Sequence, residues 1–419
     1  MATLWKAGAL TDFASRAEAA TAAMRDVFPE TPLTRNDYLS DRYDADIWLK
    51  REDLTPVRSY KLRGAFNAMR KLGGGRVACA SAGNHAQGVA WMCRHLGVEG
   101  TIFMPVTTPG QKIRKTRLFG GDRVEIRLTG DFFDATLAAA QAFCDETGAH
   151  FLSPFDDDDV IEGQASVAVE MLTQMPEPAD MVVLPVGGGG LSAGMLAYFR
   201  ARGIVPDIRY VEPAGGASLA AALADGAPVT LPTLDSFVDG AAVARIGVRP
   251  FEILRQVPPQ HVLRIPENRL CITIQEMLNT EGIVLEPAGA LSIDALRDLG
   301  PEIAGRRVVC VATGGNFDFE RLPEVKERAM RFAGLKKYYV LRMPQRPGAL
   351  RDFLDILGPD DDIARFEYLK KSARNFGSVL IGIESTGPEA FERLEHRMAD
   401  LGLASRDLTD DPLLGELVI

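Results

Sequence analysis

The sequence has few cysteines and histidines, and neither type is spaced for binding a metal. Its 419 residues include five cysteines without a CxxC pair, namely Cys79, Cys93, Cys144, Cys271 and Cys310. An odd, unclustered number of cysteines in a long chain is typical of reduced thiols, so we expect a cytoplasmic protein. Four of the five histidines stand alone, with no partner at ligand spacing: His95, His150, His261 and His396. The sequence therefore predicts no metal site.

The chain also lacks an excess of basic residues. It has 47 Lys and Arg against 57 Asp and Glu, a formal net charge of -10. Nucleic acids and anionic membranes bind basic surfaces, so we expect neither as the main partner. The uncharged run at 181–199 is nearly long enough to span a membrane, but Pro185 and four glycines divide it into strand, loop and helix. Charges at Asp12, Arg16 and Glu18 argue against a secretory leader.

Short apolar segments alternate with amphipathic ones through most of the chain. Apolar residues make up 46% of the sequence, which is sufficient for a large core. A strand followed by a helix is predicted five times, at 76–80 and 84–96, 100–105 and 110–118, 123–128 and 131–147, 181–186 and 191–202, and 208–212 and 217–223. A further strand at 307–313 follows a helix at 290–299. This order predicts parallel sheets with helices on both faces.

The pattern changes after Leu322. A charged connector at 323–336 precedes a strand, a helix, two strands and a helix, predicted at 338–343, 349–357, 363–369, 378–384 and 388–401. In the third strand, Val379, Ile381 and Ile383 fall on one face. We expect residues 337–419 to form a separate α+β domain.

Three strands run into loops of small residues, at 81–88 (SAGNHAQG), 185–192 (PVGGGGLS) and 312–316 (ATGGN). Glycines let a ligand approach the backbone, and free N–H groups at a helix start attract anions, so the four glycines predict a phosphate site. The spacing of Gly188, Gly190 and Ala193 also fits a dinucleotide-binding loop, with Glu212 placed to bind a ribose. No lysine follows the glycines, which excludes a Walker A loop.

A second signal lies upstream, at Lys61. This lysine stands between Tyr60 and Leu62 at the start of a helix predicted at 61–71. A lysine in such surroundings can be partly desolvated, which favours the neutral amine that forms imines. Periodicity alone would instead place it on an exposed helix face.

Together these motifs resemble the pyridoxal-phosphate enzymes of the tryptophan-synthase β-subunit fold (fold type II), and within them the threonine dehydratases. The resemblance follows the chain in order through 31–33 (TPL), 50–65 (KREDLTPVRSYKLRGA), 81–88, 154–156 (PFD), 187–191 (GGGGL), 239–240 (DG), 286–289 (EPAG) and 313–316 (TGGN). It implies a two-lobed α/β catalytic domain over residues 1–322, with a smaller mobile lobe at about 50–150, and pyridoxal 5'-phosphate as cofactor. Because these motifs occur together and in order, a dinucleotide-binding site is disfavoured.

The resemblance also implies roles for individual residues. Lys61 would hold the cofactor covalently and act as general base, Asn84 would contact the cofactor's 3-oxygen, and Thr313 would face its pyridine nitrogen. The phosphate would be bound by Gly187, Gly188, Gly189, Gly190 and the amide of Leu191. The substrate carboxylate would be bound by the loop that contains Ser81, Gly83, Asn84 and His85.

The implied reaction is dehydration and deamination of L-threonine to 2-oxobutanoate, or of L-serine to pyruvate, opening isoleucine biosynthesis. A hydroxyl at Thr313, where transaminases have a carboxylate, suits β-elimination. Serine racemases have a serine where this chain has Ala82, so racemisation is disfavoured, and no second acid accompanies Glu212 to bind a cation. The alternatives are a serine dehydratase or racemase, a threonine or cysteine synthase, and an amino-acid sensor without catalysis.

The C-terminal domain resembles the ACT-like regulatory domains of threonine dehydratases, here in a single copy. The resemblance rests on residues 339–343, on 346–350 (RPGAL) and on the order of elements. It implies feedback by a branched-chain effector such as isoleucine or valine, in a homodimer or homotetramer. The alternative is a domain that serves only as an oligomer contact.

Overall fold

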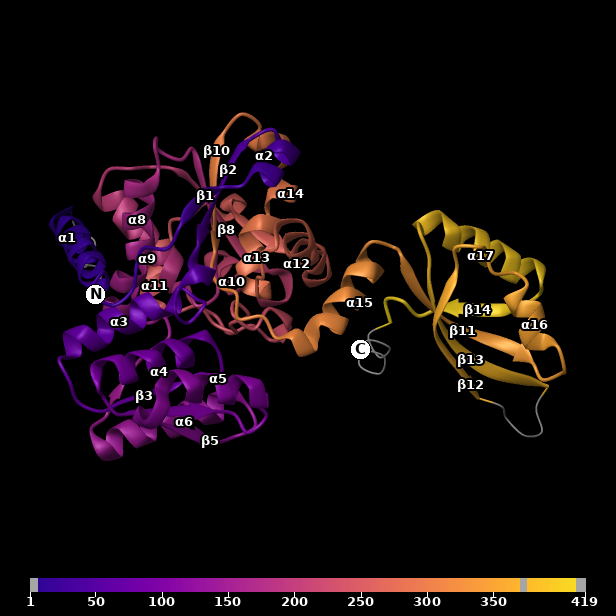
Figure 1. The fold of residues 1–419 in the computed structure, drawn as a ribbon, viewed down its shortest axis with the longest axis horizontal. Coiled ribbons are helices and arrows are strands. Elements are labelled where there is room, and N and C mark those ends of the chain that lie inside the picture. The colour runs from indigo at the N-terminus through magenta and orange to yellow at the C-terminus, as the bar shows by residue number, and fades with distance from the viewer. Residues whose placement is uncertain (1–6, 370–374, 412–419) are drawn as a thin grey trace. The chain divides into compact units, whose positions relative to one another are not determined.

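The computed structural model describes residues 7–369 and 375–411, which form two compact units (Figure 1). Unit 1 spans Met1–Asp318 and unit 2 spans Phe319–Ile419. Residues 370–374 and 412–419 of the predicted 337–419 domain lie outside the described residues. In the described ranges, no helix combines the length and the apolar character needed to cross a membrane.

Unit 1 contains two sheets, each at the centre of a lobe (Figure 1). The large lobe has six strands in the order β1-β2-β10-β7-β8-β9, in which β1 is antiparallel to β2 and the other pairs are parallel. Its strands are β1 (Leu33–Arg35), β2 (Asp46–Arg51), β7 (Met181–Pro185), β8 (Asp207–Pro213), β9 (Val262–Ile265) and β10 (Arg307–Ala312). The small lobe has four parallel strands in the order β5-β4-β3-β6. Its strands are β3 (Val77–Ala80), β4 (Gly100–Met104), β5 (Val124–Leu128) and β6 (His150–Phe151).

Helices surround the two sheets, and most of them connect parallel strands, as parallel pairing requires. They are α1 (Ala7–Met24), α2 (Asp37–Tyr43), α3 (Lys61–Leu72), α4 (Asn84–Leu96), α5 (Gly110–Gly120), α6 (Phe133–Thr147), α7 (Asp158–Gln164), α8 (Ser166–Gln174), α9 (Gly190–Ala201), α10 (Ser218–Asp225), α11 (Val248–Leu254), α12 (Glu267–Glu281), α13 (Pro287–Asp294) and α14 (Leu296–Leu299). The predicted α/β fold with parallel sheets is confirmed, and α4 has the bounds that the sequence predicted.

The helix predicted at 290–299 is interrupted, because Ala295 separates α13 from α14. Ala165 separates α7 from α8 in a similar way. At Ala165 the backbone N–H is shared between the oxygens of Ile161 and Gly163, which tightens the turn and ends the regular α-helical spacing. Hydrophobic periodicity does not detect such a turn.

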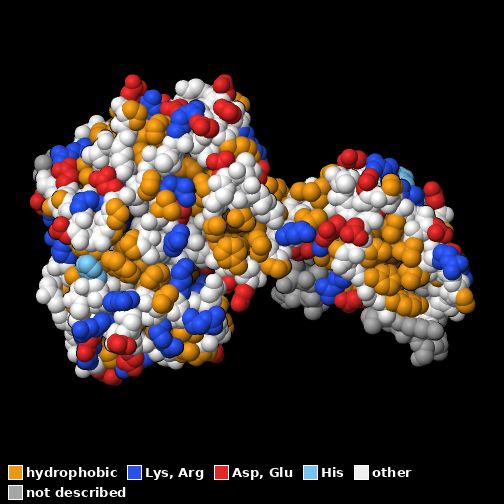
Figure 2. All heavy atoms as spheres, viewed as in Figure 1, with side chains coloured by type: hydrophobic (Ala, Val, Ile, Leu, Met, Phe, Trp, Pro, Cys, Tyr) orange, Lys and Arg blue, Asp and Glu red, His pale blue; other side chains and the backbone are white. Residues whose placement is uncertain are grey.

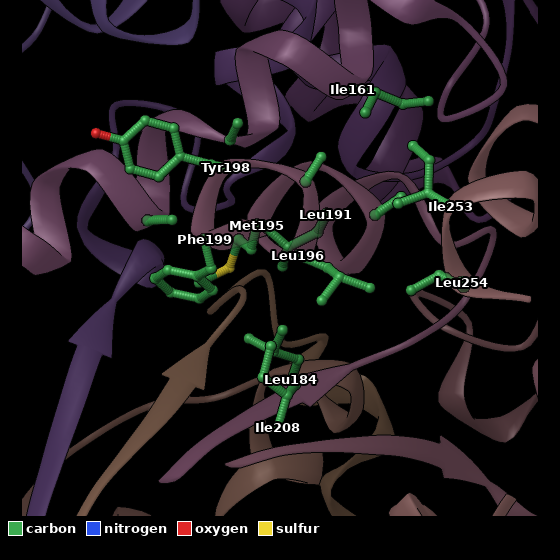
Figure 3. Packing of buried hydrophobic residues seen from close by; sticks show 14 of the residues in the cluster. Ile161, Leu184, Leu191, Met195, Leu196, Tyr198, Phe199, Ile208, Ile253 and Leu254 are labelled. Atoms are coloured by element: carbon green, nitrogen blue, oxygen red, sulfur yellow. The ribbon is translucent and has the colours of Figure 1, made fainter. Parts of the chain in front are cut away.

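The core of the large lobe surrounds α9. Every residue of this helix from Gly190 to Phe199 is buried, because β-strands lie on one side and α1, α7, α8 and α11 pack around it. A helix that is apolar all round is stable only in such a position. Figure 3 shows Leu191, Met195 and Phe199 among the packed side chains. Burial of α9 fixes the position of the glycine loop from which it begins.

Unit 2 is a four-stranded antiparallel sheet with helices. The strand order is β12-β13-β11-β14, and the strands are β11 (Lys336–Pro344), β12 (Asp362–Leu369), β13 (Phe376–Glu384) and β14 (Ala404–Asp407). The helices are α15 (Leu322–Phe332), α16 (Ala349–Leu354) and α17 (Pro388–Asp400). As predicted, Val379, Ile381 and Ile383 share the buried face, where they pack with Phe353 and Phe391 of the helices. The strand β14 was not predicted, because its residues are all exposed and do not alternate.

Candidate active site

The amine of Lys61 lies in apolar surroundings at the first position of α3. Its Nζ donates a hydrogen bond to the carbonyl oxygen of Pro154 at 2.9 Å and lies 5.4 and 5.8 Å from the ring centroids of Tyr60 and Phe155. Burial lowers the pKa of this amine to about 8, although the charge of Glu286 opposes the shift. A substantial share of Lys61 is therefore neutral and nucleophilic near physiological pH.

The four glycines form a turn between β7 and α9 that leaves no room for side chains. A Cβ on Gly188 would lie 2.1 Å from the ring of Phe155, and one on Gly187 would lie 3.0 Å from the backbone of Ala241. Gly189 has a φ of +89°, a conformation that glycine adopts readily. The first N–H groups of α9 have no partner within the helix, so the turn offers donors to an anion.

Phe155 links the lysine to the glycine turn. Its ring lies beside the Lys61 amine and packs against Gly188, while its Cβ and backbone lie against Gly190. The following residue, Asp156, accepts hydrogen bonds from the backbone of Val248 and Arg249 at the start of α11. The structure thus brings together two predicted parts of the site that are far apart in the sequence.

Asn84 belongs to a chain of side-chain hydrogen bonds. Its Nδ2 donates to Glu286 Oε1 at 2.6 Å, and its Oδ1 accepts from Asn316 Nδ2 at 2.6 Å. Gly240 lies close to this pair, since a Cβ there would be 3.5 Å from Glu286 Oε1 and 3.8 Å from Asn84 Nδ2. Burial raises the pKa of Glu286 to about 7. No role had been predicted for Glu286.

Thr313 lies at the end of β10, opposite the segment that leads into α3. Its hydroxyl is buried and donates to the carbonyl oxygen of Ala288 at 3.1 Å, which leaves its oxygen free to accept. The backbone N–H of Tyr60 donates to Thr313 O at 3.2 Å, and Ser59 pairs with Gly314. These bonds place Thr313 next to the residues that precede Lys61.

The predicted substrate loop leads from β3 into α4. Ser81 Oγ accepts from the N–H of Gly83 at 3.2 Å, and α4 begins at Asn84. The imidazole of His85 is buried, and its Nε2 donates to Leu152 O at 2.9 Å. Burial and the nearby charge of Lys61 lower its pKa to about 3, so the ring is neutral. His85 can therefore offer its backbone N–H, at the positive end of the helix, rather than its side chain.

Glu212 binds backbone N–H groups of this chain, whereas in a dinucleotide site it would bind a ribose. It is fully buried, and its two oxygens accept hydrogen bonds from the N–H groups of Leu219 and Ala220, at 2.7 and 2.9 Å. Burial raises its pKa to about 7. The carboxylate is therefore committed to the start of α10. Within the described residues, no group of three or more His, Cys, Asp or Glu side chains could hold a metal ion.

These residues fit pyridoxal phosphate. The glycine turn suits a phosphate because added Cβ atoms would fill it, and the desolvated amine of Lys61 suits an aldehyde. The hydroxyl of Thr313 suits a ring nitrogen if its proton turns away from the oxygen of Ala288. Nothing in this donor set requires a second cofactor.

Two family models match the chain. The first, described as a pyridoxal-phosphate dependent enzyme, matches residues 24–314, and the second, the C-terminal regulatory domain of threonine dehydratase, matches 327–418. The chain is 47% identical over 382 residues to the biosynthetic L-threonine dehydratase IlvA of Bacillus subtilis, covering 90% of each chain. It is 43% identical over 405 residues to that of Staphylococcus aureus, covering 94% of this chain and 96% of the relative.

Solved structures show the same likeness. Threonine deaminase isoform 2 from Solanum lycopersicum superposes with a TM-score of 0.70 at 35% identity, over 76% of this chain and 94% of that one. The structure of maize serine racemase, at 24% identity and a TM-score of 0.67 over 76% of this chain and 98% of that one, shares the fold. The chain belongs to the pyridoxal-phosphate-dependent enzymes and, within them, to the family of biosynthetic L-threonine dehydratases.

Proposed function

We propose that this protein converts L-threonine to 2-oxobutanoate and ammonia, and L-serine to pyruvate, as the first step of isoleucine biosynthesis. The observation that carries this proposal is the position of Phe155, whose ring contacts both the glycine turn and the surroundings of the Lys61 amine. The names of the relatives support the choice of substrate.

Each residue of the site has a proposed task toward the cofactor. Pyridoxal phosphate, when bound, supplies an electron sink for the negative charge that develops at the substrate's α-carbon. The N–H groups from Gly187 to Leu191 bind its phosphate, Asn84 binds its 3-oxygen, and Lys61 forms the covalent link. Thr313 faces the ring nitrogen with a neutral hydroxyl, which favours rapid β-elimination.

Lys61 is the proposed general base. With its pKa at about 8, the free amine can take the α-proton of the substrate. The β-hydroxyl then leaves as water with the proton that Lys61 has taken up, and the released enamine becomes an imine. Hydrolysis of that imine takes up one water and releases ammonia, so no oxidant or reductant is needed.

The loop from Ser81 to His85 binds the substrate carboxylate in this proposal. The hydroxyl of Ser81 and the N–H groups at the start of α4 are suitable donors, and the positive end of the helix favours an anion. Ala82 offers no hydroxyl to reprotonate the α-carbon, which favours elimination over racemisation.

We also propose different functions for different parts of the chain. Residues 1–322 are catalytic and include a mobile lobe at about 50–150. Residues 323–336 connect this part to residues 337–419, which bind isoleucine or valine as a feedback inhibitor.

The protein assembles as a homodimer or homotetramer. Exposed apolar side chains on the strands of unit 2, namely Phe366, Tyr368 and Phe376, support a contact with another copy. Figure 2 shows hydrophobic side chains gathered on one face of this unit. Five free thiols and bacterial biosynthetic relatives support a cytoplasmic location.

The test is formation of 2-oxobutanoate from threonine alone, with no second substrate. We expect the wild type and Lys71→Ala to be active and Lys61→Ala to lose at least a thousandfold in kcat. Lys71 is a matched control because it lies on the same helix and pairs with Asp159 at the surface. Wild-type protein that needs a second substrate would instead be a β-replacement enzyme, and protein with no cofactor absorbance band would not be an enzyme of this kind.

A further inference from the structure

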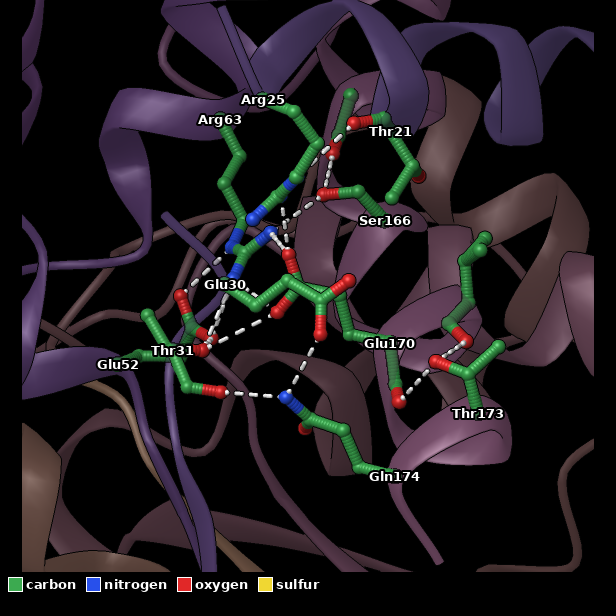
Figure 4. A network of polar contacts seen from close by, with 12 residues as sticks. Thr21, Arg25, Glu30, Thr31, Glu52, Arg63, Ser166, Glu170, Thr173 and Gln174 are labelled. Carbon is green, nitrogen blue, oxygen red and sulfur yellow. Dashed lines mark hydrogen bonds and ion pairs between the residues drawn. The ribbon is translucent and has the colours of Figure 1, made fainter. Parts of the chain in front are cut away.

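A cluster of charged side chains lies fully buried beside the lysine helix (Figure 4). Its centre is Arg63, which follows Lys61 by two residues on α3. We propose that Arg63 is a positioning residue, which holds the first turn of α3 against the large lobe so that the Lys61 amine keeps its place beside the glycine turn. The inference rests on the proposed function of Lys61 and deepens it.

The guanidinium of Arg63 binds two carboxylates, each through two hydrogen bonds. Glu52 accepts from Nε at 2.7 Å and from one terminal nitrogen at 2.9 Å, while Glu170 accepts from the two terminal nitrogens at 2.7 and 2.8 Å. The hydroxyls of Ser166 and Thr31 accept further bonds at 3.0 Å. Such planar, two-pronged recognition restricts both the position and the orientation of an arginine.

The cluster contains charges of both signs, and Glu170 also forms an ion pair with the partly exposed Arg25. Lys50 is buried with it and donates to Glu170 at 2.6 Å. Burial opposes the charge of Arg63, but Glu52 and Glu170 outweigh it and raise the pKa of Arg63 above its usual range. Burial likewise opposes the charge of Glu170, but Arg63 and Lys50 hold its pKa below the usual range. Arg63 and Glu170 therefore stay ionised, and removing either would leave a buried charge unpaired.

The partners of Arg63 come from different elements of the large lobe. Glu52 lies in the short 3-10 helix Glu52–Leu54 that follows β2, Ser166 and Glu170 lie in α8, and Thr31 lies just before β1. The apolar side of α3 faces elsewhere, since Leu62, Phe66 and Met69 pack in the core with residues of β3 and α4. α3 therefore contacts both lobes, and Arg63 is its buried ionic link to the large one.

Close helix crossings reinforce this link. A Cβ on Gly163 of α7 would lie 2.6 Å from Arg63 O and 2.9 Å from the Cα of Gly64, so α3 and α7 touch backbone to backbone. A Cβ on Gly194 of α9 would lie 2.4 Å from Ile161 O, so α9 touches α7 in the same way. The lysine helix and the helix that begins at the glycine turn therefore both rest on α7, with little freedom to change their separation.

The residues before Lys61 are held by backbone hydrogen bonds that do not involve Arg63. The N–H of Tyr60 donates to Thr313 O at 3.2 Å, and the N–H of Gly315 donates to Arg58 O at 3.0 Å. Lys61 thus lies between a backbone attachment on one side and the Arg63 cluster on the other. A change at Arg63 should rotate or loosen the first turn of α3 while the glycine turn, which α9 holds, stays in place.

The test separates the two parts of the site in the full-length, cofactor-free protein. Affinity for 4'-deoxypyridoxine 5'-phosphate, which has the ring and the phosphate but no aldehyde, reports on the glycine turn. The rate at which pyridoxal phosphate becomes reducible onto Lys61 by borohydride, identified by peptide mass, reports on the amine. We expect Arg63→Lys to slow covalent linkage at least tenfold and to change the analogue's affinity less than threefold.

Arg269→Lys is the matched control. Arg269 also pairs with two aspartates of the large lobe, Asp294 and Asp298, neither of which belongs to the Arg63 cluster. We expect its linkage rate to stay within threefold of the wild type. An unchanged linkage rate in Arg63→Lys, or equal losses of linkage and analogue affinity, would overturn the proposal.

A milder variant keeps the test decisive if Arg63→Lys does not fold. Ser166→Ala removes one hydroxyl acceptor of Arg63 and leaves every charge in place. We expect linkage to slow about threefold with unchanged analogue affinity, and a wild-type rate in this variant would count against the proposal. Wild-type protein that binds the analogue but never links pyridoxal phosphate would refute the proposed function itself.

Discussion

The carboxylate of Glu286 accepts a hydrogen bond from the side-chain amide of Asn84, with 2.6 Å between Oε1 and Nδ2. Glu286 is 5% exposed and precedes the first residue of α13. Burial, reinforced by the charge of Asp239, raises its pKa from 4.5 to about 7, although the bond from Asn84 acts in the opposite direction. The residue beside the proposed cofactor ligand is therefore a carboxyl group that titrates near neutrality.

Replacing Glu286 should change how stability depends on pH. Between pH 4.5 and about 7 the folded protein holds a proton at Glu286 that the unfolded chain has released, so the free energy of unfolding falls as pH rises through this window. In Glu286→Gln the contribution of Glu286 to this fall is lost, while that of Glu212 remains. The stability of the variant relative to wild type should therefore rise by about 1–3 kcal/mol from the lower to the upper end of the window. Urea unfolding of the cofactor-free protein, followed by the fluorescence of Trp48 and Trp91, measures this. Glu99→Gln, at an exposed site, is the control, and a difference that does not vary with pH would contradict the assignment.

The amine of Lys61 should react at an unusually low pH in the cofactor-free protein. Because burial lowers its pKa from 10.5 to about 8, the neutral form appears as pH rises through about 8. Trace acetylation followed by peptide mass spectrometry should give a midpoint near pH 8 for Lys61, against a value above 10 for a lysine in a short peptide. A midpoint for Lys61 as high as that of the peptide would show that the amine is not desolvated.

Gly188→Ala should weaken cofactor binding. The new Cβ would lie 2.1 Å from the ring of Phe155, so either the ring or the turn must move. We expect affinity for pyridoxal phosphate to fall at least tenfold in an absorbance titration. Gly387→Ala in unit 2 is the control, because its Cβ would meet only the flexible carboxylate end of Glu389. Wild-type affinity in Gly188→Ala would mean that the phosphate binds elsewhere.

Removing unit 2 should abolish feedback. We expect isoleucine to make the threonine saturation curve of the full chain more sigmoidal. An effector that binds outside the active site inhibits by coupling its own affinity to the affinity for the substrate. A chain ending at Leu322 should retain the reaction and no longer respond to isoleucine, as measured by a threonine titration with and without the effector. Identical curves for the full chain with and without isoleucine or valine would leave unit 2 without the proposed regulatory role.

The sequence predicted those parts of the fold that depend on neighbouring residues. The bounds of α4 could be found because small residues precede it and Gly97 ends it in a left-handed conformation. The buried face of β13 followed from the alternation of Val379, Ile381 and Ile383. In contrast, β14 has only exposed residues, and it is a strand because β11 pairs with it.

The site was predicted less completely than the fold. The tasks of Lys61 and the four glycines could be inferred from motifs, but the involvement of Glu286 could not, since its bond to Asn84 depends on tertiary contact. The Arg63 cluster was missed for the same reason. Glu52 and Glu170 lie far from each other in the sequence, and an arginine within a helix resembles a solvent-facing residue until its partners are known.

The glycine crossings of α7 with α3 and α9 also bear on protein engineering. Exchanging helical glycine for alanine is a common way to raise thermostability. At Gly163 or Gly194 the added methyl group would meet the backbone of the neighbouring helix and push the two helices apart. A design that treats these positions as ordinary helix interiors would lower the conformational entropy of the unfolded chain. It would also increase the distance between the Lys61 amine and the glycine turn. Stabilising substitutions should therefore be placed elsewhere in the protein.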